Sequence, residues 1–191
     1  MPERGPRLVL GLGNPGAEYE GTRHNLGFDV VDRLAQRAGL SFRKAPRAHT
    51  ARGESGGAPY VLAKPQTFMN NSGRAARELL AELGEGTELL VVCDDFHLPL
   101  GRLRCRASGS DGGQKGLASV INTLVGRDVP RLRMGIDEPP SGVPSEDYVL
   151  RRFKRGEADV VEAMIERAAD CVAAWLEHGD LQKLINAANA P

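Results

Sequence analysis

The chain contains little cysteine and no long apolar run, and its formal net charge is zero. Its three cysteines are Cys93, Cys105 and Cys171, and no two of them have the C-x-x-C spacing. This odd number argues against the disulfide framework of a secreted domain and against a zinc knuckle. No apolar run approaches the ~20 residues of a membrane span, and the N-terminus lacks the apolar stretch of about 7–15 residues that marks a signal peptide. We therefore expect a soluble, cytoplasmic protein.

Length and composition are those of one globular domain. The 191 residues fit a single unit of the usual ~100–200 residues. Hydrophobic residues make up 41% and charged residues 26%, which is ordinary for a globular chain. Glycine and proline together number 35, so loops are expected to be many or functional. We expect one domain over residues 1–191, with its core at about 7–188.

The balanced net charge conceals an uneven distribution. Arginine supplies 20 of the 25 basic residues, and its planar guanidinium suits phosphate. Residues 96–136 carry seven bases and two acids, whereas residues 157–180 carry seven acids and one base. Such runs are often solvated faces, but a basic face of this kind can also meet a polyanion. The zero net charge disfavours broad binding to DNA or other nucleic acid and leaves room for a local phosphate site.

The hydrophobic pattern alternates between strand and helix periods. Strands are expected at Arg7–Leu12, Pro59–Ala63, Glu88–Cys93, Arg102–Arg106 and Arg131–Ile136, with an adjacent strand pair near 48–63. Helices are expected at Phe28–Ala38, Ser72–Leu83, Gly116–Val125, Val160–Leu176 and Leu181–Ala188, with Ser72 as an N-terminal cap. This order predicts a single globular α/β domain, with a mixed β-sheet flanked by helices.

A glycine-rich motif, Gly11–Gly16, follows the first strand and matches G-x-G-x-x-G. In a dinucleotide-binding site the helix starts at this loop, and a ribose-binding acid ends a second strand about 20 residues later. Here the next apolar helical period begins only at Phe28, and Asp29 and Asp32 fall within that helix. The glycines are better explained by a close approach of the backbone to another element.

A histidine and an aspartate are candidates for acid–base chemistry. His24 lies in a polar stretch between two glycines, where packing gives it little purpose, although many loop histidines have no function. Asp94 follows a buried strand, and ligands bind at that edge of an α/β sheet; a turn or cap is the alternative role. No G-x-S-x-G occurs, and no second histidine has the spacing of a metal site. Hydrolysis by a His–Asp pair and an activated water stays open.

Several further segments, taken together, resemble bacterial peptidyl-tRNA hydrolases from about Leu8 to Trp175. The matching segments are residues 11–16, Tyr19, Thr22–Asn25, Pro65–Asn70, Asp94, Leu98–Gly101 and Arg131–Ile136. Members of this family have a single α/β domain with a mixed sheet. They cleave the ester that joins a peptide to the 3′ end of tRNA, and so recycle tRNA from chains dropped by the ribosome.

The resemblance implies roles for the catalytic side chains. His24 corresponds to the general base that takes a proton from the attacking water, and Asp94 to the residue that orients it. Asn70 corresponds to a contact near the scissile ester. Asn14 corresponds to the residue that distinguishes peptidyl-tRNA from free aminoacyl-tRNA. No metal and no organic cofactor is implied.

The resemblance also implies how tRNA is held. Tyr19 and Phe68 correspond to aromatic residues that line the site. Arg106 and Arg133 correspond to a basic pair that grips the 5′-phosphate of tRNA, a contact that positions the substrate without reading sequence. The expected partner is thus peptidyl-tRNA, bound at its 3′ end and its 5′-phosphate by a monomeric enzyme.

Three positions depart from the common family pattern. Gln114 and Lys115 stand where His-Asn is usual, so an amide that commonly contacts tRNA is replaced by a lysine. His97 replaces an acid common in the turn after Asp94. Two other functions remain open from the sequence: a non-catalytic RNA-binding relative, and a hydrolase of small N-acyl amino-acid esters.

Overall fold

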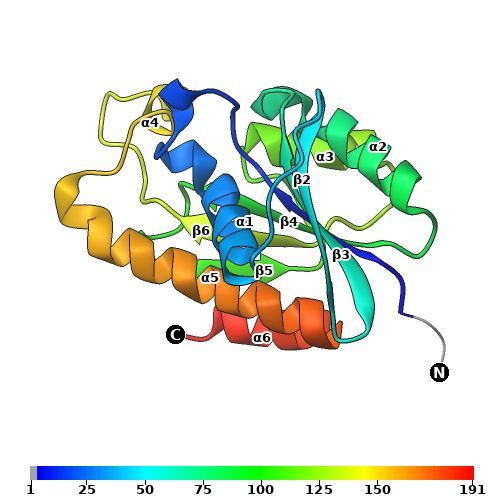
Figure 1. Ribbon diagram of the computed structural model, residues 1–191. Coiled ribbons are helices and arrows are strands. Elements are labelled where there is room, and N and C mark those ends of the chain that lie inside the picture. Colours follow the sequence, from blue (N-terminus) through cyan, green and yellow to red (C-terminus); the bar gives the residue numbers. More distant parts are fainter. Residues whose placement is uncertain (1–3) are drawn as a thin grey trace.

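The structure is a computed structural model that describes residues 4–191, and its centre is a six-stranded mixed sheet (Figure 1). The strands are β1 (Arg7–Gly11), β2 (Ala48–Ser55), β3 (Ala58–Pro65), β4 (Glu88–Asp95), β5 (Leu103–Arg106) and β6 (Arg131–Gly135). Their order is β2-β3-β1-β4-β6-β5. The four inner strands run parallel, and β2 and β5 form antiparallel edges. The carboxyl ends of β1, β3, β4 and β6 therefore meet at one edge.

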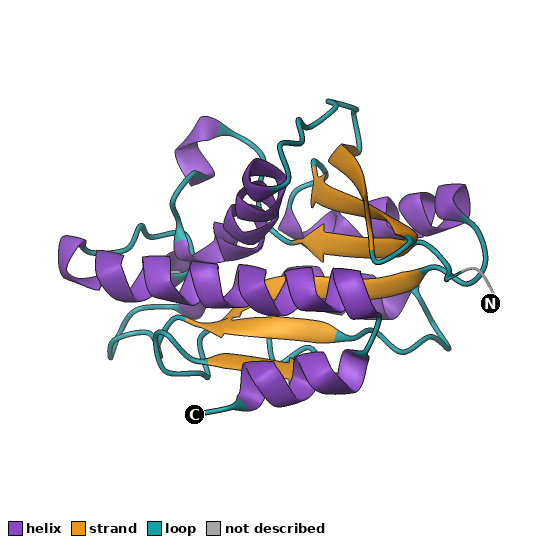
Figure 2. Cartoon of the chain, turned by 60° about the horizontal axis from the view of Figure 1, so that its bottom comes forward, coloured by secondary structure: helices purple, strands orange, loops and turns teal. Residues whose placement is uncertain are grey.

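Helices cover both faces of this sheet. One face carries α1 (Leu26–Arg37), α5 (Ala158–His178) and α6 (Leu181–Asn189), and the other carries α2 (Ser72–Leu83) and α3 (Lys115–Thr123). Figure 2 shows α5 lying lengthwise along its face, with α6 beside it. The two faces bury separate apolar clusters, because alternate residues of each inner strand point to opposite sides. A short helix, α4 (Ser145–Tyr148), lies in the long connection between β6 and α5.

The predicted α/β architecture is confirmed, and the expected strands and helices lie within a few residues of the observed ones. The short α4 and the 3₁₀ turns, among them Arg23–Asn25 and Met69–Asn71, were not predicted. The prediction that Ser72 caps α2 is wrong. Ser72 is the first residue of the helix, and its hydroxyl donates to the carbonyl of Met69 at 2.7 Å instead of accepting from the helix.

The glycine-rich motif serves close packing between α1 and the sheet. A Cβ on Gly11 would collide with the carbonyl oxygen of Gly27, the second residue of α1. A Cβ on Gly27 would in turn collide with the backbone of Leu12 and Val92. The close approach expected of these glycines is thus an approach between helix and strand.

The fold brings its polar loops together at the carboxyl edge of the parallel strands. The loop after β1 begins at Leu12, and the loop after β3 leads to the turn Met69–Asn71. β4 ends in Asp94 and Asp95 at the same edge. No helix within the described range 4–191 is long and apolar enough to cross a membrane.

Candidate active site

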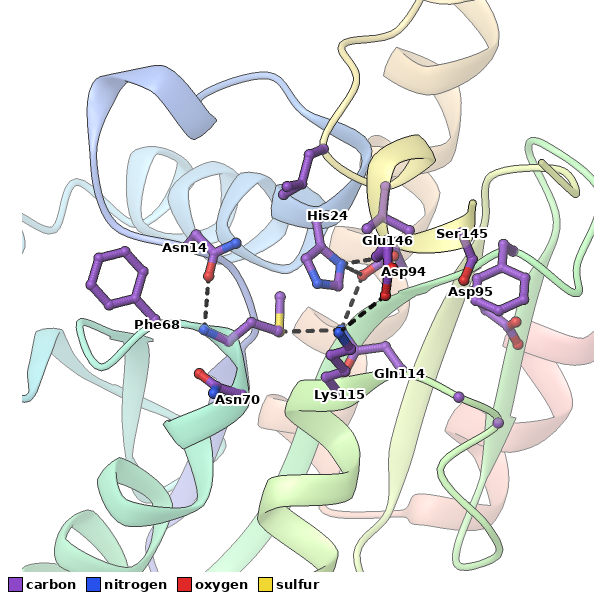
Figure 3. A pocket seen from close by; sticks show the side chains of 16 residues that line it. Asn14, His24, Phe68, Asn70, Asp94, Asp95, Gln114, Lys115, Ser145 and Glu146 are labelled. Carbon is purple, nitrogen blue, oxygen red and sulfur yellow. Dashed lines mark hydrogen bonds and ion pairs between the residues drawn. The ribbon is translucent and has the colours of Figure 1, made fainter. Parts of the chain in front are cut away.

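A cavity of about 240 Å³ opens at this edge of the sheet (Figure 3). Its walls come from six parts of the chain: the loop after β1, the turn that precedes α1, the loop after β3, the end of β4, the start of α3, and α4 with the residues after it. The predicted site residues among its lining are Asn14, His24, Phe68, Asn70, Asp94 and Lys115. Segments far apart in the sequence thus converge on one cavity, and most of the predicted residues share it.

His24 and Asp94 form a buried pair at the base of the cavity. The Nδ1 of His24 lies 2.9 Å from Oδ1 and 3.1 Å from Oδ2 of Asp94. His24 is 7% exposed and Asp94 is 1% exposed. Because an ionised carboxylate can only accept, Nδ1 carries the hydrogen, and the neutral imidazole has its lone pair on Nε2. That nitrogen has no hydrogen-bond partner in residues 4–191, so it is free to accept a proton from a water in the cavity.

The turn that carries His24 is fixed by its neighbours in sequence. Arg23 makes an ion pair with Glu157 at 2.9 Å, and its guanidinium lies over the rings of Tyr148 and Phe153. The pKa of Glu157 is lowered because hydrogen bonds from the Lys154 backbone and from Arg23, with nearby positive charge, outweigh the effect of burial. The turn that carries the imidazole is therefore held in place by contacts with the residues just before α5.

The main chain of the same turn is bonded to the segment that follows α4. The backbone N–H of His24 donates to the carbonyl of Val149 at 2.8 Å, and that of Arg23 donates to Arg151 at 3.0 Å. Val149 also lines the cavity. Backbone hydrogen bonds thus join the turn that carries His24 to the segment that follows α4.

Asn14 is held with its amide in one orientation. Its Oδ1 accepts from the backbone N–H of Met69 at 2.7 Å, while Asn25 bonds both the N–H and the carbonyl of the Asn14 backbone. Figure 3 shows the nitrogen of the Asn14 amide turned toward His24. Since a backbone N–H needs an acceptor, the Nδ2 group must be the one presented to the cavity as a donor.

The aromatic residues lie at the rim. Phe68 is 53% exposed and has φ 58° and ψ 158°, a conformation that is strained for any residue with a side chain. This backbone turns the Phe68 ring outward while directing the N–H of Met69 to Asn14. Tyr19 packs edge-on against Phe68, with ring centroids 6.4 Å apart, but does not itself line the cavity. Asn70 is exposed at the cavity edge.

The predicted phosphate-binding arginines lie on the β5–β6 pair, outside the cavity. Arg133 stands opposite Arg104 in the register, and Arg106 stands opposite Arg131, so all four point to one face. Arg106 is exposed, whereas Arg133 makes an ion pair with Asp95 at 3.1 Å.

Lys115, the residue that departs from the family pattern, lines the mouth of the cavity and is exposed there. Its Nζ faces Glu146 of α4 at 3.6 Å. An exposed pair at this distance contributes little to stability, so Lys115 remains available to a ligand.

Several lining residues were given no role by sequence reasoning. They include Gln114, whose amide bonds Asp94, and the α4 segment with Ser145, Glu146, Val149 and Leu150. Asn25 was noticed only as part of a motif, although it holds Asn14. For Gln114 and Asn25 the available signal was a polar side chain just before the start of a helix.

Cys93 precedes Asp94 on β4 and is fully buried. Burial raises the pKa of the Cys93 thiol far above neutrality, so it stays protonated and is not a nucleophile. In the described part of the chain, no group of three or more His, Cys, Asp or Glu side chains is arranged to hold a metal. The groups that are present suit proton abstraction from water.

The fold and the cavity, with a buried His–Asp pair at the carboxyl edge of a mixed sheet, define an α/β enzyme of the hydrolase class. A family model described as peptidyl-tRNA hydrolase matches residues 8–191. The chain belongs to the peptidyl-tRNA hydrolase family.

Individual relatives agree with this assignment. The peptidyl-tRNA hydrolase of Moorella thermoacetica is 44% identical over 184 residues, covering 95% of this chain and 97% of its own. That of Methylacidiphilum infernorum is 48% identical over 162 residues, covering 84% and 86%. The crystal structure of peptidyl-tRNA hydrolase from Acinetobacter baumannii superposes with a TM-score of 0.87 at 30% identity, covering 96% of this chain and 94% of that one.

Proposed function

We propose that this chain hydrolyses the ester bond between peptide and tRNA in peptidyl-tRNA and so returns free tRNA to translation. The observation that carries the proposal is the buried His24–Asp94 pair facing an open cavity. His24 Nε2 takes a proton from a water, and the water oxygen attacks the ester carbonyl. The bond to the ribose oxygen then breaks, and that oxygen takes the proton back from the imidazolium. Asp94 keeps the imidazole in the required tautomer and stabilises the imidazolium that forms.

Asn14 gives this site a reason to prefer blocked substrates. Its Nδ2 is the group presented to the cavity, so it donates to the acyl carbonyl that peptidyl-tRNA carries on its last amino nitrogen. Free aminoacyl-tRNA has no such carbonyl and presents an ammonium instead. A buried charge without a partner is costly, which disfavours that substrate.

The remaining rim residues are proposed to hold the 3′ end. Asn70, at the exposed edge of the cavity, donates through its amide to the ester region in this proposal, and an oxyanion donor of this kind contributes about 2.7–4 kcal/mol in comparable sites. Phe68, backed by Tyr19, offers an exposed ring on which the terminal adenine stacks. Lys115 at the cavity mouth meets the nearby backbone phosphates as a point charge.

The test of this function is the release of N-acetyl-amino acid from N-acetyl-aminoacyl-tRNA, compared with the same tRNA carrying a free amino acid. Rapid release from the blocked substrate is expected, with little from the unblocked one, because only the former satisfies Asn14. Binding of tRNA without any release would favour a non-catalytic RNA-binding protein. Equal release from both substrates would contradict the role given to Asn14.

A second contact is proposed between the 5′-phosphate of tRNA and the pair Arg106 and Arg133. Both side chains point to one face of the β5–β6 pair, and the guanidinium of Arg133 lies beside Gly112, which lines the cavity. Charge-assisted bonds from guanidinium to phosphate are strong and independent of base sequence. The face therefore positions the acceptor end while the 3′ end enters the cavity.

Changing both Arg106 and Arg133 to alanine is expected to raise KM for N-acetyl-aminoacyl-tRNA by roughly tenfold or more, since a hydrogen bond to a charged group contributes about 1.5–3 kcal/mol. A short N-acetyl-aminoacyl-adenosine lacks the 5′-phosphate and should be cleaved as before. The double variant also removes the ion pair between Arg133 and Asp95. Arg106→Ala alone keeps that pair and therefore serves as the milder control. Equal losses on both substrates would count against a phosphate contact.

We further propose that residues 1–191 act as one monomeric domain in the cytoplasm, without a cofactor. In support of a single domain, all six strands belong to one sheet that carries helices on both faces. The catalytic groups are side chains of that chain, and the substrate is a product of translation.

A further inference from the structure

The side chain of Gln114 lies between the catalytic aspartate and the start of α3 (Figure 3). Its Nε2 donates to Oδ1 of Asp94 at 3.1 Å, and its Oε1 accepts from the backbone N–H of Leu117 at 2.7 Å. Gln114 is the N-terminal cap of α3 and is only 7% exposed. One amide group thus serves both the helix and the carboxylate that holds His24.

The two bonds fix which end of the amide faces Asp94. The Leu117 N–H is a donor and requires the oxygen, so the nitrogen must point to the carboxylate. Met69 packs on the same NH₂ group, with its sulfur 3.3 Å from Nε2. A Cβ on Gly116 would collide with that sulfur, so the absence of a side chain there makes room for this arrangement.

Asp94 consequently has donors on two sides. Oδ1 receives both His24 Nδ1–H and the amide of Gln114, in a position where the carboxylate is almost completely shielded from water. A buried carboxylate needs such donors to remain ionised and in place. An amide supplies its hydrogen bond at every pH, unlike an imidazole or a carboxyl group.

We propose that Gln114 is a positioning residue, which holds Asp94 in place and aimed at His24 through a donor that does not titrate. This inference rests on the proposed function. It implies that the support of Asp94 by Gln114 is the same at every pH, so that kcat does not fall at alkaline pH.

The other charged groups at this cavity are already paired. Asp95, next to Asp94 on β4, is bound to Arg133 of β6 at 3.1 Å. Lys115 of α3 faces Glu146 of α4 at 3.6 Å. The thiol of Cys93, on the other side of Asp94, is kept protonated by burial. None of these groups contacts Gln114 Nε2.

Two variants of nearly unchanged length separate this role from helix capping. In Gln114→Glu one carboxyl oxygen can still accept from Leu117, but the other faces Asp94 and donates only when protonated. Two carboxyls this close share one proton and lose it in a step that belongs to the pair. Gln114→Met retains the bulk and removes both bonds.

The experiment measures kcat and KM for N-acetyl-aminoacyl-tRNA from mildly acidic to mildly alkaline pH, with an enzyme-free blank and the thermal midpoint of each variant. For the unsubstituted protein we expect kcat to rise with pH and then stay level. For Gln114→Glu we expect a bell, with kcat falling on the alkaline side by about tenfold as the shared proton leaves and Asp94 is repelled. For Gln114→Met we expect kcat to fall about tenfold at every pH, with KM unchanged.

The outcomes separate the two claims. A Gln114→Glu profile with the shape of the unsubstituted profile would overturn the positioning role, as would unchanged kcat in Gln114→Met. Losses that follow only the thermal midpoint, with no change of profile, would reduce Gln114 to a helix cap. An unsubstituted protein that releases no N-acetyl-amino acid would instead overturn the proposed function, and the positioning role with it.

Discussion

Replacing His24 with alanine is expected to lower kcat for N-acetyl-aminoacyl-tRNA by at least about 10²–10⁴-fold, the range that general-base catalysis contributes. The reason is geometric: His24 is the only histidine that lines the cavity within residues 4–191, and its Nε2 faces the open space. Binding of tRNA should persist, because the exposed ring of Phe68 and the arginines of β5 and β6 remain. The measurement is single-turnover release beside a filter-binding assay.

The matched control is His178→Ala, an exposed histidine at the far end of α5. It should retain the activity of the unsubstituted protein. If His24→Ala hydrolysed the substrate at an undiminished rate, His24 would not be the base. If it lost tRNA binding in parallel with turnover, its role would be structural.

Asp29→Asn is expected to stabilise the protein above neutral pH. Asp29 lies in the first turn of α1, and burial together with the nearby charge of Asp32 raises its pKa from 3.8 to about 7. The folded protein therefore binds a proton there that the unfolded chain has lost. The contribution of Asp29 to stability is fully present below its unfolded pKa of 3.8, falls as pH rises from there to about 7, and is constant above that.

The size of the effect follows from the shift. At 1.36 kcal/mol per pKa unit the upper bound is about 4 kcal/mol, and the favourable interaction of a carboxylate with the helix N-terminus offsets about 0.3–1 kcal/mol of it. The measurement is denaturant unfolding of both proteins at about pH 4 and pH 8, where the advantage of the variant should appear only at the higher pH.

Asp32→Asn provides the contrast to Asp29→Asn, because it removes the 2.6 Å ion pair between Asp32 and Lys64 and should give no gain. If the difference in free energy of unfolding between Asp29→Asn and the unsubstituted protein were the same at both pH values, this carboxyl would not be held in its protonated form.

The sequence predicted the positions of those residues that depend on local sequence pattern. The strand that ends in Asp94 was visible as an apolar run, and the edge of the sheet at which it ends followed from the α/β pattern. The motif around His24 added the partner. The expectation that the glycines of 11–16 serve a close approach was sound for the same reason, since the helical period that begins at Phe28 is a local feature.

The rest depended on packing between distant segments. Gln114 reaches Asp94 only because α3 docks with its N-terminus over the end of β4, and no local pattern specifies that docking. Arg23 and Glu157 are 134 positions apart and meet through the placement of α5. Ser72 has the composition of a cap, yet the preceding 3₁₀ turn shifts the helix start by one residue and gives its hydroxyl another partner.

The interlock of Gly11 with Gly27 has a consequence for interpreting variants of this protein. Gly27 follows His24 by three residues, and neither glycine has space for a methyl group against the facing backbone. Any larger residue at either position must push α1 off the sheet, and the imidazole would move with the helix that begins beside it. In a saturation mutagenesis screen for activity, substitutions of either glycine would therefore lower activity as strongly as substitutions of a catalytic residue. Their substitution nevertheless displaces the His24 side chain without altering its chemistry.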